Sequence, residues 1–275
     1  MMEHGTQPVD FSRYNPEGSL LRRDQKELLR ILKFVAGVCE EHHLQWWLDS
    51  GTLLGAARHK GFIPWDDDID IALMRDDYLK LEKILCEMNS EEFVFHCIKT
   101  DPDYVNTFGK FRKKSGCVKV KSKRYDYYRW AGVGIDVFAI EKINYPAACL
   151  GRFIYKLFIN PTVHIRNTSV RHAFISFGQF VCFRLVFPFL RMVGKINPKG
   201  EYHYALGIGW TRAMYSINTL LPVSEVEFEG ERMPAPNDVN GYLGILYGDW
   251  EKLPSEEQIK KSIHCQEYRE EIFGE

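Results

Sequence analysis

The stretch from Gly51 to Ile71 joins a small Gly-Thr turn to a run of alternating carboxylates. The part from 67 to 73 reads as a strand, and side chains two positions apart on a strand point to the same side. Asp68 and Asp70 are therefore expected to project together, while the isoleucine after each of them faces a core. Two carboxylates about 4 Å apart repel by roughly 4 kcal/mol at an effective dielectric near 20, so a cation between them is favourable. Because Mg²⁺ is held by one or two carboxylates plus phosphate oxygens, the pattern indicates a phosphoryl-transfer site.

The turn at Gly51 and Thr52 supports this interpretation over the alternative of a solvated acidic turn. It follows a strand-like run at 45–49 and leads into a helix-like run at 53–58. A turn between a strand and a helix offers backbone N–H groups and the positive end of the helix to a phosphate. The acidic pattern alone is a weak motif, and the turn beside it makes the combination more specific.

A third carboxylate strengthens the prediction of a metal site. Asp136 lies inside the nearly continuous apolar run 133–140, which reads as a strand. An unpaired charge at such a position is costly. A metal ion shared with Asp68 and Asp70 gives Asp136 a partner.

Size and composition limit the class of protein. The 275 residues, 45% of them hydrophobic, are enough for one domain with an elaboration or for two small domains. The net charge of −1 does not favour a nucleic-acid partner. Seven scattered cysteines without a C-x-x-C pair argue against a zinc site or a disulfide framework, and fit a reducing cytosol. The polar start, 1–16, lacks the apolar core of a secretory signal.

The remaining pattern predicts an α/β (α+β) fold, a mixed sheet with helices packed on it. Ser19 is expected to cap a helix reaching to about residue 43, and Ser255 to open a capping box before a last helix. The C-terminal part is expected to contain a short strand near 228–233 and a helix capped by Asn237. Further elements are expected as a helix at 76–88 and strands at 93–98, 107–112 and 117–120.

Residues 145–200 differ from the rest of the chain in being rich in Phe, Ile, Val and Arg, with Pro161 and Pro188 as expected breakers. Helices packed on the catalytic core are the favoured interpretation, because apolar helix faces usually pack inward. A helix resting in a membrane interface is the second, because cationic and aromatic residues interleave. A membrane span is the least favoured, because polar side chains interrupt the apolar run.

Several motifs in the right order resemble the LicD family, a branch of the nucleotidyltransferase-fold superfamily that includes the fukutin-related proteins. The opening turn is similar at 47–55, the acidic signature at 61–70, the third-carboxylate strand at 134–138 and the C-terminal block at 242–254. The joint pattern is far more specific than any one piece. The resemblance implies a nucleotidyltransferase-like core at 1–144, a helical insertion at 145–225 facing a membrane or an acceptor, and a segment at 226–275 that completes the catalytic domain.

The resemblance also implies an activity. Enzymes of this kind transfer phosphocholine, or a related phospho-alcohol, from CDP-choline or another CDP-alcohol to a sugar hydroxyl, and release CMP. The implied acceptor is a cell-surface glycan or lipid-linked glycan, such as lipopolysaccharide or teichoic acid. The implied location is the cytoplasm, with peripheral contact at the inner face of the cell membrane through 145–200. One or two Mg²⁺ ions, for which Mn²⁺ can substitute, are expected on Asp68, Asp70 and Asp136, which are also the implied catalytic residues.

Other residues are implied in substrate binding. The proton of the acceptor hydroxyl is expected to go to Asp136 or Asp66, and the sequence does not choose between them. A choline head group needs aromatic ring faces, with core packing as the ordinary role of such rings. A solvated strand edge is the alternative for the basic pair Lys110 and Arg112. The expected substrate-binding residues are Gly51, Thr52, Arg58, Asp66, Lys110, Arg112, Trp65 and Trp130, with further aromatic candidates at Trp46, Trp47, Tyr127, Tyr128 and Trp250.

Three other functions compete. A metal-dependent glycosyltransferase also binds a nucleotide sugar through Asp-x-Asp, but the Gly-Thr turn before the acidic strand is not expected there. A catalytically inactive nucleotide-binding module is disfavoured by the intact set of three carboxylates. An RNA-modifying nucleotidyltransferase is disfavoured by the near-neutral net charge.

Overall fold

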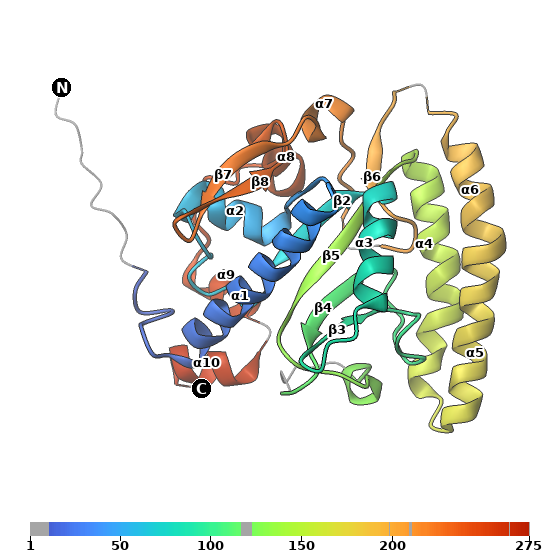
Figure 1. The fold of residues 1–275 in the computed structure, drawn as a ribbon, viewed down its shortest axis with the longest axis horizontal. Coiled ribbons are helices and arrows are strands. Elements are labelled where there is room, and N and C mark those ends of the chain that lie inside the picture. The colour runs from blue at the N-terminus through green and yellow to red at the C-terminus, as the bar shows by residue number, and fades with distance from the viewer. Residues whose placement is uncertain (1–10, 117–122, 198, 209–210, 264, 275) are drawn as a thin grey trace.

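The structure is a computed structural model that describes residues 11–116, 123–197, 199–208, 211–263 and 265–274. Its centre is a mixed sheet in the order β1-β2-β5-β4-β3, with β6 pairing the C-terminal half of β5 (Figure 1). Strands β2 and β5 run parallel and the other pairs are antiparallel. The expected mixed sheet with helices is confirmed. The strands are β1 Trp46–Leu48, β2 Asp70–Met74, β3 Phe93–His96, β4 Gly109–Lys113, β5 Gly134–Lys142 and β6 Tyr202–Tyr204.

Helices α1 (Leu20–Glu41) and α3 (Arg75–Glu87) both pack on β5 and lie in front of the sheet in Figure 1. Helix α2 (Ser50–His59) packs on β2. The expected cap of α1 is confirmed, since Ser19 Oγ accepts a hydrogen bond from the N–H of Arg22 at 3.1 Å. Of the apolar residues near helical spacing, Leu21, Leu28, Leu32 and Val35 are buried, whereas Val38 is half-buried and the neighbouring Cys39 is buried.

The C-terminal part forms a hairpin and helices beside β1 (Figure 1). The prediction of a single strand near 228–233 is wrong, because Glu229 and Gly230, both with positive φ, turn the chain there. Asp238, not Asn237, caps the next helix by accepting from the N–H of Gly241 at 2.9 Å. The capping box at Ser255 is confirmed. The elements are α7 Ile217–Leu220, β7 Ser224–Phe228, β8 Glu231–Ala235, α8 Val239–Tyr247, α9 Glu256–Ser262 and α10 Gln266–Phe273.

The acidic strand starts later than the alternation predicts. Strand β2 begins at Asp70 rather than at residue 67, because pairing with β1 begins opposite Leu48, at Ile71. The chain before it forms a turn, in which the N–H of Asp66 donates to the carbonyl of Ile63 at 2.9 Å. Asp68 therefore lies in the loop, and the argument that placed it on one strand with Asp70 is wrong.

The expected helix at 76–88 is α3, and the expected strands at 93–98, 107–112 and 133–140 correspond to β3, β4 and β5. The strand expected at 117–120 lies outside the described residues. A short 3₁₀ turn, η1 (Tyr125–Tyr127), precedes β5.

The segment after β5 forms a helical unit at the right of Figure 1. It has its own small hydrophobic core, which includes Tyr155, Phe187 and Leu190. Pro188 does not break it: the proline directly follows the π-helical turn at 181–186, where the regular hydrogen-bond pattern of the stretch Thr168–Gly194 is already altered. The unit consists of α4 Tyr145–Ile159, the 3₁₀ turn η2 Asn160–His164, α5 Thr168–Phe180, the π-helical turn η3 Val181–Val186 and α6 Phe187–Gly194.

The expected helical range 145–225 is helical only in part, since β6 within it joins the sheet. Buried Glu141 on β5 holds the unit to the core by accepting from Arg191 Nε at 2.5 Å and from the N–H of Leu206 at 3.0 Å. Among the described residues one helical stretch, Thr168–Gly194, is long and apolar enough to cross a membrane.

Candidate active site

A row of ionisable side chains crosses the sheet. Asp70 on β2 is the register partner of Asp136 on β5, Asp136 is the partner of Lys110 on β4, and Lys110 is the partner of His96 on β3. Directly opposed residues on neighbouring strands point to the same face. Four groups between residues 70 and 136 of the sequence are thereby brought together by backbone pairing alone.

The charges along this row balance only in part. The Lys110 ammonium donates to Asp136 Oδ1, and both side chains are largely buried. Burial lowers the pKa of Lys110, but the carboxylate of Asp136 more than offsets this and leaves the pKa raised. Burial raises the pKa of Asp70 well above its ordinary value, and Asp68 and Asp136 raise it further. Among the described residues, the carboxylates of Asp70 and Asp136 therefore face one bonded cation, Lys110.

The loop before β2 adds more carboxylates. Asp66, Asp67 and Asp68 each present an oxygen within 4.8 Å of the others, and no other group of three potential ligands this close occurs among the described residues. Asp68, Asp70 and Asp136 do not form such a group, and the predicted metal set of these three residues stays a prediction. Burial raises the pKa of Asp66 well above its usual range, with Asp68 and then Asp67 raising it further.

The Gly-Thr turn lies directly against these carboxylates. It forms the first turn of α2, which is capped by Asp49. The Oγ1 of Thr52 accepts from the N–H of Asp70 at 2.8 Å. A Cβ added to Gly51 would lie 2.8 Å from Asp66 Oδ2, so a larger residue here would require the Asp66 carboxylate to move. The expected proximity of turn and acidic segment is thus present.

Asp49 has a structural environment that the sequence did not predict. Its carboxylate is fully buried and accepts from Tyr204 Oη at 2.8 Å, from Tyr242 Oη at 2.6 Å and from the N–H of Ser50 at 2.7 Å. Burial raises the pKa of Asp49, and the two tyrosine hydroxyls act in the opposite direction. Since these tyrosines lie more than 150 residues away, no local signal points to them.

Gln25 is a second residue that the sequence analysis missed. This fully buried amide donates from Nε2 to the carbonyl of Asp66 at 2.9 Å and accepts from Asn15 Nδ2 at 2.9 Å. It thereby links α1 to the acidic loop. A signal was present, because Gln25 is the one polar residue in the apolar stripe between Leu21 and Leu28.

A cavity of about 510 Å³ lies beside Trp65, the residue that precedes the acidic loop, and none of the carboxylates of that loop lines it. It is lined by Arg58, Trp65, Tyr247 and Trp250 among others. Tyr247 connects the cavity to the carboxylates, since its pKa is raised first by burial and then by Asp70. Arg58 is held in place, with Nη1 donating to the carbonyl of Trp250 at 3.1 Å.

The other basic residue on β4 is buried. Arg112 is 4% exposed, so it does not guard a solvated strand edge. Its Nη1 donates to the carbonyl of Trp130 at 2.6 Å. The ring of Trp130 contacts Arg129 on its face and His96 at its edge. The predicted substrate contacts of Arg112 and Trp130 stay predictions, with these groups already in contact with protein.

The remaining aromatic candidates divide by burial. Trp46 and Trp47 are 5% and 0% exposed and belong to the core. The Arg171 guanidinium covers the face of Tyr127 at 3.9 Å, and Tyr128 packs on Tyr104. Trp65 is 6% exposed and also belongs to the core, where its ring packs against Phe11, Tyr14 and His59. Trp250 is half-buried and lines the cavity.

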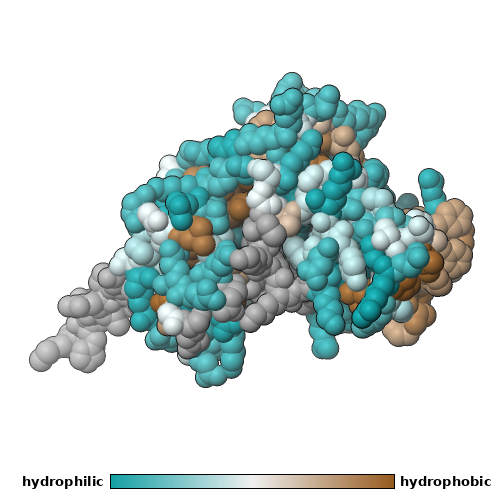
Figure 2. All heavy atoms as spheres, turned by 90° about the horizontal axis from the view of Figure 1, so that it is seen from below, coloured by the Kyte–Doolittle hydropathy of each residue, from teal (hydrophilic) through white to brown (hydrophobic). Residues whose placement is uncertain are grey.

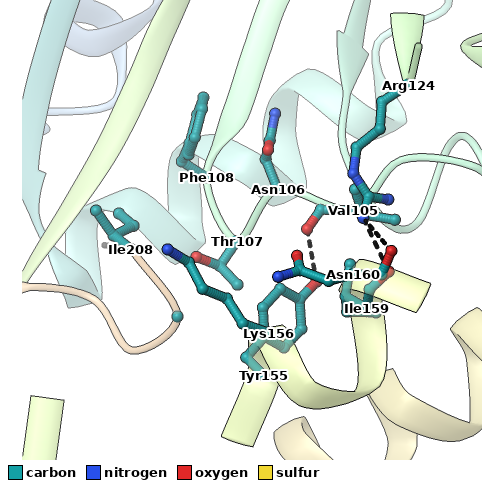
Figure 3. Close-up of a pocket in the computed structure, with 11 residues that line it drawn as sticks. Val105, Asn106, Thr107, Phe108, Arg124, Tyr155, Lys156, Ile159, Asn160 and Ile208 are labelled. Carbon is teal, nitrogen blue, oxygen red and sulfur yellow. Dashed lines mark hydrogen bonds between the residues drawn. The ribbon is translucent and has the colours of Figure 1, made fainter. Parts of the chain in front are cut away.

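A second cavity, of about 290 Å³, lies between the loop before β4 and helix α4 (Figure 3). Tyr155 Oη donates to the carbonyl of Val105 at 2.7 Å, and Arg124 Nη2 donates to the carbonyl of Ile159 at 2.8 Å. Both bonds tie the helical unit to the core, and Lys156 lines the same cavity.

The nucleotidyltransferase domain described as LicD/FKTN/FKRP matches residues 43–173. This range contains the turn, the acidic loop and all four members of the row across the sheet. Over this range the chain carries a domain of the LicD family. The match also runs into α4 and α5, a region that the sequence motifs did not cover.

Relatives of the chain carry named activities. The lipopolysaccharide cholinephosphotransferase LicD of Haemophilus influenzae is 28% identical over 267 residues, which are 90% of this chain and 97% of the relative. The human ribitol 5-phosphate transferase FKRP is 39% identical over 59 residues, 22% of this chain and 12% of the relative. An uncharacterised protein of Rickettsia prowazekii is 43% identical over 58 residues, 21% of this chain and 22% of the relative. Both named activities are transfers of a phosphorylated alcohol, which supports phosphotransferase activity in this family member.

Proposed function

We propose that this protein transfers a phospho-alcohol, with phosphocholine as the first choice, from a CDP-linked donor to a sugar hydroxyl of a cell-surface glycan, and releases CMP. The observation that carries the proposal is the meeting of the acidic loop 66–68, the pair Asp70 and Asp136, and the first turn of α2. The family membership and the cholinephosphotransferase relative of nearly equal length support it.

The chemistry of the site fits Mg²⁺. Its ligand atoms are carboxylate oxygens, which magnesium and manganese prefer over nitrogen or sulfur donors. Asp68 and Asp70 are the proposed ligands, together with Asp136 or the neighbouring Asp66 and Asp67. When bound, the ion neutralises charge on the donor diphosphate.

The residues of the chain supply the other functions. The N–H groups of Gly51 and Thr52 lie in the first turn of α2, where they can donate to a phosphate oxygen. Lys110 is placed to stabilise charge that develops on the transferred phosphoryl group. The attacking hydroxyl forms the new P–O bond as the bond from phosphorus to the CMP oxygen breaks.

Between the two candidate bases, the environment favours Asp66. Its carboxylate lies against the first turn of α2, where the donor phosphate is proposed to bind, so it is placed to accept the hydroxyl proton where Asp136 completes the metal set. Asp136 is already ion-paired with Lys110, which makes it a poorer acceptor. The rings of Tyr247 and Trp250, both partly exposed in the cavity, can cover a quaternary ammonium group.

The test is a panel of CDP-choline, CDP-ethanolamine, CDP-glycerol and CDP-ribitol with Mg²⁺, measured by thermal shift and by CMP release. We expect one donor to stabilise the wild type by about 2.7 kcal/mol at 100 times its Kd. Asp68→Asn should lose this stabilisation and should reduce CMP release roughly 100-fold. Glu87→Gln, which removes an exposed carboxylate at the end of α3, serves as the control and should behave as the wild type.

Three outcomes would contradict the proposal. Release of UDP or GDP from a nucleotide sugar would indicate a glycosyltransferase. Binding of a donor without turnover would indicate an inactive nucleotide-binding module. Indifference of the wild type to every donor would remove the basis for a CDP-alcohol altogether.

A further inference from the structure

The helical unit α4–α6 exposes an unusual amount of apolar surface. Twelve of the eighteen exposed large hydrophobic side chains in the described part of the chain lie between residues 150 and 196. Hydrophobic side chains gather at the right-hand end of the molecule in Figure 2, the end where Figure 1 places this unit. We call these residues the apolar face: Leu150, Phe153, Leu157, Val170, Phe174, Phe177, Phe180, Leu185, Phe189, Met192, Val193 and Ile196.

The apolar face is the outward side of the long helical stretch. The inward side is already packed, with Ile175, Cys182 and Phe187 buried in the small core of the unit. The outward side carries Phe177 and Phe180, each 58% exposed. A helix on a water-exposed surface normally presents polar side chains outward. Contiguous exposed apolar patches of this kind mark sites of protein or membrane interaction.

The charge of the unit identifies the kind of partner. Residues 143–200 contain eight Lys and Arg and no Asp or Glu. Since the chain has 36 basic and 37 acidic residues, the other 217 residues carry 28 basic against 37 acidic. The segment that carries the apolar face therefore has a net charge of +8, whereas the rest of the chain has a net charge of −9. Lys156, Arg184 and Lys195 are exposed in it.

A second copy of the chain is a poor partner for this surface. A two-fold interface would place the same cationic segment against itself, with no acidic side chain on either side to compensate. An anionic bilayer offers negative head groups for the Lys and Arg side chains and an acyl region for the phenylalanines. Arg171 and Arg191 stay bound to Asp103 and Glu141 of the core, so the long helix is held along the domain.

We propose that the apolar face binds the surface of a bilayer that contains anionic phospholipid, with α4 and the long helical stretch lying in the plane of the interface. The phenylalanines insert at the boundary of head groups and acyl chains, and the exposed Lys and Arg side chains contact phosphates. Binding through this face needs neither donor nor acceptor, so it can hold or fail independently of the proposed transfer reaction.

The test is flotation of the full chain with vesicles of phosphatidylcholine alone or with about 30 mol % phosphatidylglycerol. We expect the wild type to bind the anionic vesicles at least tenfold more strongly, and less as salt rises. Phe177→Ser combined with Phe180→Ser should lower binding at least tenfold. The control pair Ile217→Ser with Ile245→Ser, at exposed apolar positions outside the unit, should bind as the wild type. Lys156→Gln with Arg184→Gln should lose several-fold of the preference for anionic vesicles.

Circular dichroism and thermal melting of each variant separate loss of binding from loss of fold. Sedimentation without lipid tests whether a second copy of the chain covers the apolar face instead of a bilayer. A wild-type dimer that Phe177→Ser with Phe180→Ser dissociates, with no vesicle binding by either protein, would overturn the proposal in favour of self-association. Equal binding to neutral and anionic vesicles, or equal loss in the control pair, would also overturn it.

Discussion

At the residue scale, several side chains are held in unusual protonation environments, and His59 can be tested directly. Burial and the neighbouring Arg58 lower the pKa of His59 to about 4. Arg58 Nε donates to His59 Nε2 at 3.0 Å, which requires the neutral imidazole as acceptor. Phe11 and Trp65 pack edge-on against the ring. The folded state therefore disfavours protonation of this side chain.

The pH dependence follows from that difference. Between pH 6.5 and about 4 the unfolded chain binds more protons at His59 than the folded protein does, so stability falls as the pH falls through this window. We expect His59→Gln, which keeps an acceptor for Arg58 without titrating, to remove about 1–2 kcal/mol of that loss. Urea unfolding of both proteins at pH 7 and pH 4.5 measures it. An identical loss in the two proteins would contradict the assigned pKa.

At the scale of single elements, a substitution in the first turn of α2 is expected to lower activity while it changes stability little. Gly51→Ala places a Cβ against the Asp66 carboxylate, so we expect CMP release to fall at least tenfold. Alanine is otherwise better than glycine in a helix by about 0.5–1 kcal/mol, so the melting temperature should change little. Gly37→Ala in α1, where nothing lies within 4 Å, is the matched control and should only stabilise. A Gly51→Ala protein as active as Gly37→Ala would show that Asp66 has no role in the reaction.

At the scale of the whole molecule, the C-terminal block shares one hydrophobic core with the central sheet. Tyr242 on α8 donates to the buried Asp49 carboxylate, whereas Tyr215, stacked on Tyr242, has a buried hydroxyl without a hydrogen-bond partner among the described residues. Tyr242→Phe should lower the free energy of unfolding by about 1–3 kcal/mol, because a buried carboxylate loses a donor. Tyr215→Phe should be neutral or stabilising. Denaturant unfolding compares the two, and equal effects would refute the assigned role of Tyr242.

Local chemistry explains which parts of the fold the sequence predicts well. The caps at Ser19 and Ser255 depend on residues three positions away, and the strand around Asp136 on a continuous apolar run. The start of β2 depends on where strand β1 offers hydrogen-bond partners, which the residues of β2 themselves do not indicate. In the same way, a proline in this run is expected to break a helix. Whether the helix tolerates Pro188 depends on the hydrogen-bond pattern of the preceding helical residues, which the local sequence does not show.

The site follows the same division. The acidic loop and the Gly-Thr turn are close in sequence, so their proximity could be predicted, and Asp136 could be added because its charge needed a partner. The pairing of Lys110 with Asp136 and the position of His96 depend on strand order, which no local pattern contains. The roles of Gln25, Tyr204 and Tyr242 depend on packing between distant segments.

The strand register has a consequence for how this enzyme family can vary. Neighbouring strands in a sheet lie about 4.8 Å apart, so the steps from Asp70 through Asp136 and Lys110 to His96 have lengths fixed by the backbone. The three steps together fix the length of the row at about 14 Å. A relative that accepts a longer or shorter alcohol must therefore exchange the side chains of this row or rebuild the loops around it. A shift of one strand by a single residue would turn the side chain that this strand contributes to the opposite face of the sheet.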